Sequence, residues 1–425
     1  MTISSLVQLA DAEAVSQYWT AHLHSVMVPL LKAAGTYTPE EQAKHLAFLE
    51  KVVSHNLGPL PTEPHAPYTA PSAIVGSPFD PSINFTSSGN AKVRFDHDLL
   101  APLNRAGSDP FGEAQARELV RDLASKIEGS DTRWFEYLMD SFWLQGDEVD
   151  AALKIIPPHV TTCPGAVGFD LDGGKITLKA YVPVVCKAFA TGKSFSDVII
   201  NALRKTEHLG VDLQPSLDFV AEYMATTNDD RKLMLVGVDC VEPQDARVKM
   251  YCHVSNNSWN VVKDIMTLGG RLTDETSITR VDMLKTIWPL LLDEPDMPIE
   301  DESWSKEQKI KRTGFSGLQF TIELTPGEAI PDLKVYVPLF QYARSHAQSE
   351  KNIEAILKKL NHSWGTSGKY AETMRTVFGE EKKYGQTYAS FSYSKSKGAY
   401  MTSYVAKPID FGAAGLDGVN HCDFF

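Results

Sequence analysis

Hydrophobic and polar positions alternate along short segments that come in pairs. The segment ITLKAYVP, 176–183, places Lys179 and Tyr181 two residues apart, so both side chains point to one face of a strand. The same alternation returns in ARVKMYCH, DLKVYVP and GAYMTSYVAK, and the tyrosines at 181, 251, 336 and 404 recur after 70, 85 and 68 residues. This spacing predicts an internal repeat whose units each present a polar, aromatic strand face.

Each of these strands is the second strand of a predicted hairpin. Turn signals join the two strands, such as SSGN before the strand at 91–98 and the Asp-Gly-Gly step at 172–174. The predicted hairpins are 82–86 with 91–98, 165–171 with 175–183, 232–239 with 246–253, 317–324 with 332–338, and 387–394 with 399–407.

Helical periodicity fills the segments between the hairpins. Trp19 and Leu23 lie on the apolar stripe of a helix over 11–34, and Thr38 with Glu41 marks the start of a second helix. Further helices are predicted over 111–127, 132–145, 194–208, 212–226, 257–267, 280–292, 349–361 and 367–379. The segments 57–79 and 295–313 are predicted to be irregular, because they are rich in proline or charge.

Five hairpins separated by helices predict an α+β fold. Ten strands with one polar face need closure, because an open sheet would leave its edges exposed. We expect an αββα barrel of ten antiparallel strands around a solvent-containing lumen, with an outer ring of helices. The chain would then be a single domain, 1–425, with N-terminal helices at 1–56, five repeats at about 78–407 and a short tail at 408–425.

Composition narrows the class of partner. A net charge of −13 over 425 residues argues against binding to nucleic acid or to a membrane surface, since both favour a basic face. We find neither a secretory signal nor an apolar run of membrane-spanning length. The five cysteines are odd in number and lack CxxC spacing, so we expect reduced thiols in a cytoplasmic protein. The oligomeric state is left open, and a homodimer is compatible with the sequence.

The side chains predicted to line the lumen are typical of an anion-binding site. Cations on separate strands are typical of a site for a polyanion such as diphosphate, and without an anion these like charges would repel: Arg94, Lys179, Arg247, Lys249 and Lys334. Tyrosine faces nearby would stabilise a carbocation. Neither DDxxD nor HExxH occurs, so we expect no metal and no cofactor. The inventory predicts ionisation of an allylic diphosphate and capture of the cation by an aromatic ring.

Through these segments the chain resembles the fungal dimethylallyltryptophan-synthase-type aromatic prenyltransferases, which have the αββα prenyltransferase barrel. The matching segments run in the family's order over about 78–404: PFDPSINF with VRF, LKAY, RVKMY, LKVYVP and YMTSY. The resemblance implies a diphosphate cradle of Arg94, Lys179, Arg247, Lys249, Lys334 and Tyr404. It implies a cation shield of Tyr181, Tyr251, Tyr336 and Tyr400.

Asp80 and Lys179 are the candidate catalytic residues. Asp80 stands where the family has a glutamate that accepts a hydrogen bond from the indole N–H, and its carboxylate would assist proton loss from the ring. Two residues that the resemblance to tryptophan 4-position enzymes would imply are absent: a lysine within 164–170, and an arginine within 233–239 that holds the amino-acid carboxylate in those enzymes. Their absence favours a larger or neutral acceptor over free tryptophan.

The sequence therefore predicts an aromatic prenyltransferase of secondary metabolism. It would move a dimethylallyl group from dimethylallyl diphosphate to an indole-containing acceptor, such as a tryptophan-derived alkaloid, a cyclic dipeptide or an indole terpenoid. Three alternatives stay open: a phenolic or polyketide acceptor, cyclisation of a longer prenyl diphosphate, and a carrier without turnover. Taken singly, each lysine or arginine also fits a surface ion pair and each tyrosine an ordinary strand position; the repetition favours the site.

Overall fold

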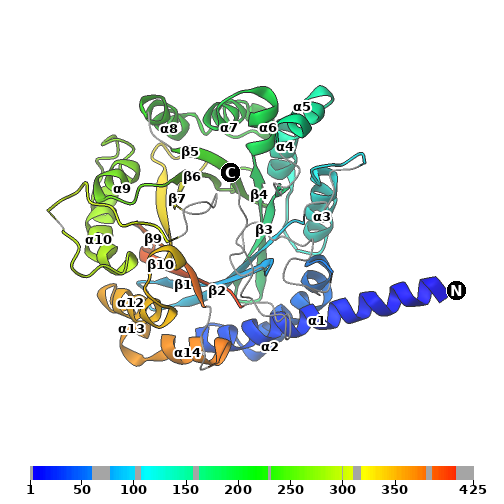
Figure 1. Ribbon diagram of the computed structural model, residues 1–425, viewed down its shortest axis with the longest axis horizontal. Helices are drawn as coiled ribbons and strands as arrows, with labels where there is room; N and C mark the ends of the chain where they lie inside the picture. The colour runs from blue at the N-terminus through cyan, green and yellow to red at the C-terminus, as the bar shows by residue number, and fades with distance from the viewer. Residues whose placement is uncertain are drawn as a thin grey trace.

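The computed structural model describes residues 3–59, 77–100, 107–156, 162–227, 231–298, 300–309, 317–379 and 385–407. The predicted tail at 408–425 and most of the segment 57–79 lie outside these residues. Ten antiparallel strands close into one barrel in which each strand pairs with its sequence neighbours and β1 pairs with β10 (Figure 1). The predicted αββα barrel is confirmed.

The strands lie close to their predicted bounds. They are β1 Phe79–Thr86, β2 Ala91–Asp98, β3 Ala166–Asp172, β4 Lys175–Pro183, β5 Lys232–Asp239, β6 Val248–Val254, β7 Leu318–Leu324, β8 Asp332–Pro338, β9 Gln386–Ser394 and β10 Gly398–Val405. The pairing register shifts at Leu233/Leu235 on β5 and at Ser403/Val405 on β10, as at a β-bulge.

The helices form a ring outside the barrel (Figure 1). Helices α1 Ile3–Ala34 and α2 Pro39–Phe48 precede the first hairpin, and α1 packs against the last helix, α14, to close the ring. The others are α3 Glu113–Ser125, α4 Arg133–Phe142, α5 Asp147–Ile155, α6 Val185–Thr191, α7 Phe195–Leu203, α8 Gln214–Thr226, α9 Trp259–Met266, α10 Glu275–Leu291, α11 Leu339–Tyr342, α12 His346–Lys359, α13 Trp364–Ser367 and α14 Lys369–Phe378.

Side-chain caps set several helix starts. Thr38 and Glu41 form the predicted capping box of α2. Helix α10 begins at Glu275, five residues before its predicted start, because the Asp274 carboxylate accepts the backbone N–H of Ser277. Helices α5 and α6 are not among the predicted elements; both are short and begin without a side-chain cap.

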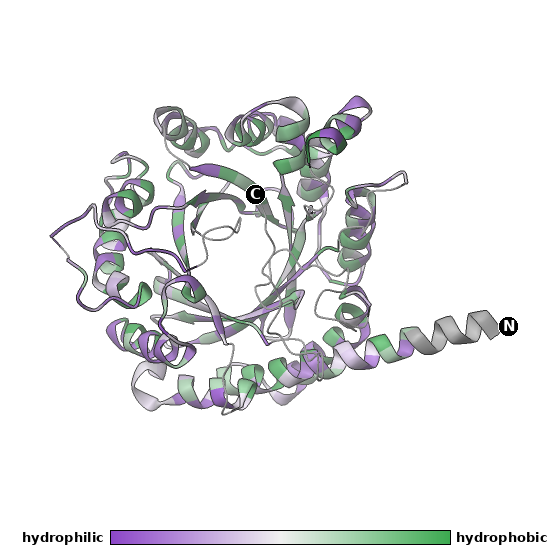
Figure 2. Ribbon diagram, viewed as in Figure 1, coloured by the Kyte–Doolittle hydropathy of each residue, from purple (hydrophilic) through white to green (hydrophobic). Residues whose placement is uncertain are grey.

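The hydrophobic core lies between the barrel and the helices. Strand residues of one parity point outward into this core, where Phe85, Phe169 and Phe320 are at most 2% exposed. Figure 2 shows hydrophobic and hydrophilic residues together on the outer helices, as expected for helices that cover a sheet. Strand residues of the opposite parity therefore face the lumen.

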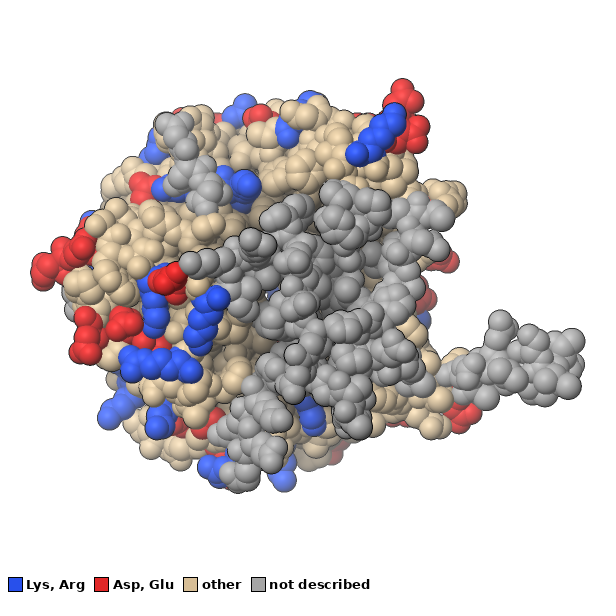
Figure 3. All heavy atoms as spheres, in the orientation of Figure 1, with Lys and Arg blue, Asp and Glu red and all other residues tan. Residues whose placement is uncertain are grey.

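Charge on the outside of the protein is mixed. Asp and Glu side chains share the rim of the face shown in Figure 3 with Lys and Arg side chains. Within the described part of the chain, no helix is both long and apolar enough to cross a membrane.

Candidate active site

The lumen of the barrel is a polar cavity. It holds about 1410 Å³ of space not filled by atoms, part of it open to solvent. Every residue that the sequence analysis named as a candidate lines it: Asp80, Arg94, Lys179, Tyr181, Arg247, Lys249, Tyr251, Lys334, Tyr336, Tyr400 and Tyr404. Residues from all five hairpins therefore meet in one space.

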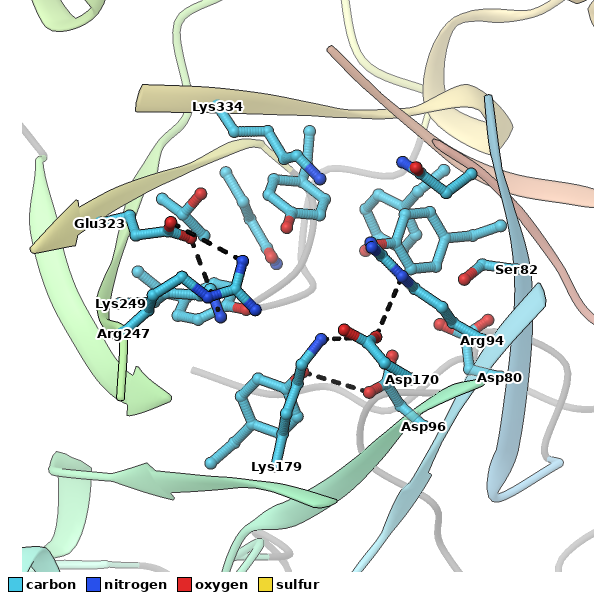
Figure 4. Close-up of a pocket in the computed structure, with 18 of the residues that line it drawn as sticks. Asp80, Ser82, Arg94, Asp96, Asp170, Lys179, Arg247, Lys249, Glu323 and Lys334 are labelled. Carbon is cyan, nitrogen blue, oxygen red and sulfur yellow. Dashed lines mark hydrogen bonds and ion pairs between the residues drawn. The ribbon is translucent and has the colours of Figure 1, made fainter. Parts of the chain in front are cut away.

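The basic residues form one group, the cation cluster, defined as Arg94, Lys179, Arg247, Lys249 and Lys334 (Figure 4). Lys179 and Lys334 are buried, with 8% and 9% of their surface exposed. The cluster occupies four strands or strand ends around the lumen, so a small anion between them would meet cations from several sides.

Three carboxylates that the sequence analysis did not name neutralise part of this cluster. Asp170 on β3 lies 3.0 Å from the Arg94 guanidinium and 2.6 Å from the Lys179 ammonium. Asp239 at the end of β5 lies 2.6 Å from Arg247 and 3.1 Å from Lys249.

The third carboxylate is Glu323 on β7. It lies 3.8 Å from both Arg247 and Lys249 (Figure 4). Adjacent strands therefore supply counter-charges to Arg94, Lys179, Arg247 and Lys249. These carboxylates offset part of the repulsion predicted for the cations without an anion, and a diphosphate would share the cations with them.

The remaining electrostatic balance still favours an anion. Burial is the largest effect on Lys179 and lowers its pKa to about 8, with Asp170 opposing this and Lys249 adding to it. Burial also holds the pKa of Lys334 well below its usual value, and the Arg94 charge lowers it further. Both ammonium groups would be stabilised by an additional negative charge.

Four tyrosines, here called the tyrosine layer, line the same lumen: Tyr181, Tyr251, Tyr336 and Tyr404. Their ring centroids follow one another at 5.9 Å, 6.2 Å and 5.9 Å. On β4, β6 and β8, which run in the same direction, the tyrosine follows a lysine by two residues. The tyrosine layer thus lies nearer to one end of the barrel than the cation cluster does.

Two glycines make room for the first ring of the layer. A Cβ atom on Gly237 of β5 would lie 2.7 Å from Cδ1 of Tyr181, and one on Gly168 of β3 would lie 3.0 Å from its hydroxyl oxygen. Glycine inside a strand commonly marks such a close approach. Both glycines stand on the two strands that lack the lysine and arginine of the tryptophan enzymes.

Tyr400 lies apart from the tyrosine layer. Its ring has the Lys334 ammonium at 5.0 Å and the Lys397 ammonium at 5.5 Å. Lys397 also lines the cavity and was not named from the sequence, because it belongs to the predicted turn of the last hairpin. Tyr404 instead packs against Tyr336. The geometry therefore fits Tyr404 better as part of the cation shield and Tyr400 better as part of the diphosphate cradle, the reverse of the predicted roles.

A carboxyl pair lies at the β1–β2 side of the lumen. Asp80 and Asp96 are direct cross-strand partners, and both line the cavity (Figure 4). Burial and then the Asp96 charge raise the pKa of Asp80 well above its usual value. Burial raises the pKa of Asp96 to about 6, although Lys179 lowers it. Asp80 is a predicted site residue, whereas Asp96 is not among the predicted ones.

Two further hydroxyls face this side of the cavity. Ser82 on β1 and Tyr388 on β9 line it, and both hydroxyl oxygens are buried without a hydrogen-bond partner among the described residues. Buried hydroxyls normally have partners, so a ligand with polar atoms fits here. Groups of three His, Cys, Asp or Glu side chains arranged to hold a metal ion are not found in the described ranges.

Comparison with known proteins agrees with this geometry. A closed barrel of five hairpins with a cation cluster and a tyrosine layer in its lumen defines the αββα-barrel class of aromatic prenyltransferases. Residues 16–373 match the tryptophan dimethylallyltransferase family, and the chain belongs to this family. The predicted resemblance and the predicted enzyme class are thereby confirmed.

Relatives share nearly the whole chain. An indole prenyltransferase of Emericella nidulans is 53% identical over 412 residues, which cover 95% of this chain and 98% of that protein. An indole diterpene prenyltransferase of Tolypocladium album is 34% identical, with 93% of this chain and 94% of that protein covered. The crystal structure of AnaPT from Neosartorya fischeri shares the fold, with a TM-score of 0.75, 24% identity, and 90% and 91% of the two chains covered.

Proposed function

We propose that this protein transfers a dimethylallyl group from dimethylallyl diphosphate to a carbon of an indole-containing acceptor. The observation that carries the proposal is the meeting of a cation cluster and a tyrosine layer in one lumen of a family member. The names of its relatives, an indole prenyltransferase and an indole diterpene prenyltransferase, support an indole acceptor larger than free tryptophan.

The cation cluster would bind the diphosphate of the donor. Arg94, Lys179, Arg247 and Lys249 present charge-assisted donors, with Lys334 and Tyr400 beside them. As the bond between the allylic carbon and oxygen breaks, the electron pair leaves with the diphosphate. Lys179 acts as a catalytic residue here, since its ammonium stabilises the negative charge that develops on the leaving group.

The tyrosine layer would shield the resulting carbocation. Ring faces attract a cation through their quadrupole, and the packed rings keep water from the allylic carbon. The indole then attacks this carbon. Asp80 is proposed to accept the indole N–H through its carbonyl oxygen, which orients the ring and stabilises positive charge on it.

The location in the cell is also a proposal. Cys163 and Cys240 are free thiols. Free thiols favour the reducing cytoplasm over an oxidising compartment. Fractionation of the native producer cells would test it: activity in the cytosolic fraction is expected, and activity confined to organelles would contradict it.

The reaction is tested directly by incubating the protein with dimethylallyl diphosphate in the presence of EDTA. The acceptor panel contains free tryptophan, a tryptophan-containing cyclic dipeptide, an indole diterpene and a phenol, and both diphosphate release and product mass are measured. Release that depends on an indole and yields a prenylated indole is the expected result. Release that is as fast without an acceptor as with an indole, or that depends on the phenol alone, would contradict the proposal.

A matched pair of variants separates the site from the rest of the strand. Lys179→Gln removes the buried ammonium and should lower turnover by about 100-fold or more. Lys175→Gln changes an exposed lysine of the same strand and should leave turnover within about twofold.

A further inference from the structure

Asp96 occupies a repeated position of the barrel that is a tyrosine on other strands. The strands β2, β4, β6, β8 and β10 run in one direction. On β4, β6 and β8 a cation is followed two residues later by a tyrosine of the layer. On β2 the cation is Arg94, and the residue two positions later is Asp96.

The cross-strand register gives the same placement. Tyr181 and Lys249 both pair with Gly237, so the tyrosine of β4 lies level with the cation of β6. Asp96 and Lys179 both pair with Gly168, so Asp96 lies level with the cation of β4 in the same way. Asp96 therefore extends the tyrosine layer as its one acidic member among the described residues.

Contacts place the Asp96 carboxylate beside the rings. The Tyr181 hydroxyl donates a hydrogen bond to Oδ1 of Asp96 over 3.2 Å. After burial, the Asp96 charge is one of the causes that raise the pKa of every member of the layer: Tyr181, Tyr251, Tyr336 and Tyr404. Gly168 leaves the space that the carboxylate fills, because a Cβ there would lie 2.0 Å from Oδ1.

We propose that Asp96 is the base that removes the ring proton of the prenylated indole, while its cross-strand partner Asp80 holds the indole N–H. This inference rests on the proposed function. The new bond joins an indole carbon to the dimethylallyl carbon, the ring carbon–hydrogen bond then breaks with its electrons returning to the ring, and the proton is transferred to an Asp96 oxygen.

The surroundings of the pair favour an ionised Asp96 near neutral pH and the protonated form of Asp80. The titratable and charged groups near Asp96 are Asp80 on β1, Arg94 on β2, Asp170 on β3, Lys179 and Tyr181 on β4, and the remaining tyrosines of the layer, Tyr251, Tyr336 and Tyr404. With a pKa of about 6, Asp96 is ionised at neutral pH, whereas the pKa of Asp80 is raised by burial and by this charge. A base with a pKa close to the working pH is effective in proton transfer.

The test compares Asp96→Asn with Asp172→Asn, using the best indole acceptor of the panel with its ring positions deuterated. Asparagine keeps the shape of Asp96 and still accepts the Tyr181 hydroxyl, but it takes up no proton. Asp172 is an exposed residue of β3, paired with Lys92 at 2.7 Å, and serves as the control. Turnover of Asp96→Asn should fall about 100-fold, and the isotope effect on kcat should rise because proton removal becomes rate-limiting.

Two further measurements separate this role from structural damage. Slow release of diphosphate by water in the absence of an acceptor needs no ring proton, so Asp96→Asn should retain it within about threefold. The wild-type protein should lose turnover below about pH 6 as Asp96 is protonated. This loss of wild-type turnover at acid pH can be measured even if the Asp96→Asn variant does not fold.

Three results would overturn the inference. They are an Asp96→Asn variant with kcat within twofold of wild type, an unchanged isotope effect in that variant, and wild-type turnover that stays constant through pH 6 while the protein remains folded. Failure of the proposed function is distinguishable, because the wild-type protein would then prenylate no indole at all.

Discussion

At the residue scale, close contacts within the lumen determine which side chains tolerate change. Tyr181 is held between Gly168 and Gly237, and its hydroxyl holds the Asp96 carboxylate. A methyl group is therefore enough to disturb both the ring and the carboxylate.

Gly168→Ala should lower turnover by about tenfold or more while the protein still folds. The new Cβ would lie 2.0 Å from Oδ1 of Asp96, so the carboxylate must move. Gly174→Ala is the matched control, since its Cβ would meet nothing closer than Glu41 Cγ at 3.6 Å. Steady-state kinetics of both variants tests this, and equal turnover of the two would contradict it.

Asp96→Asn should stabilise the folded protein at neutral pH. The pKa of Asp96 is raised to about 6 by burial, so its contribution to stability is present below the unfolded value of about 4 and is lost as pH rises through about 6. The variant cannot ionise and should exceed wild type by about 2 kcal/mol in the free energy of unfolding at pH 8. Urea denaturation at pH 8 and pH 4 measures this; a gap that is largest at pH 4 would contradict the assignment.

At the element scale, neighbouring strands supply opposite charges. Among the described residues, the carboxylates that pair with the cation cluster come from the first strand of a hairpin: Asp170 on β3, Asp239 on β5 and Glu323 on β7. The cations they pair with lie on or beside the neighbouring strands. The charge balance of the lumen therefore depends on pairing both within hairpins and between adjacent hairpins.

Asp170→Asn should destabilise the protein by about 3–5 kcal/mol at pH 7, because it leaves Arg94 and Lys179 without their counter-charge. Those two cations outweigh burial and hold the pKa of Asp170 far below its usual value. Its contribution is thus present above pH 4 and is lost as pH falls.

Denaturation at pH 7 and at low pH measures this loss. The surface pair of Asp172 and Lys92 provides the control, since Asp172→Asn should cost less than about 1 kcal/mol. Added inorganic diphosphate should narrow the gap between Asp170→Asn and wild type. Equal stability of the two Asn variants would contradict the role of Asp170.

Strand parity explains how much of the site the sequence could predict. The Lys-x-Tyr spacing on β4, β6 and β8 fixes both residues on the lumen face, so eleven lining residues followed from alternation and from the family's motifs. The carboxylates share that face, but their signal appears only when both strands of each hairpin are aligned in register. Asp96 could not be predicted as a site residue from its own strand, because its position becomes recognisable only by comparison with the tyrosines at the same position of other strands.

At the scale of the whole molecule, closure of the barrel makes a charged lumen in which Lys179 and Lys334 are buried from solvent. Burial lowers the pKa of Lys179 to about 8 and holds that of Lys334 well below its usual value. The bound donor would reverse both shifts, since an anion favours the ammonium form.

Binding of inorganic diphosphate at pH 8 should therefore be accompanied by proton uptake at these lysines. Calorimetry in Hepes, Tris and Pipes measures the uptake, because the apparent binding enthalpy then follows the ionisation enthalpy of the buffer. Lys334→Met should reduce the uptake. An enthalpy that is the same in all three buffers would contradict the account.

The central claim is that the lumen holds the donor with its diphosphate in the cation cluster and its dimethylallyl group under the tyrosine layer. A crystal structure with the unreactive thiolodiphosphate analogue of the donor tests this most directly. The account predicts phosphate oxygens within hydrogen-bond distance of Arg94, Lys179 and Lys249, and an allyl group facing Tyr251 and Asp96. An analogue bound outside the barrel, or with its two ends reversed, would contradict it.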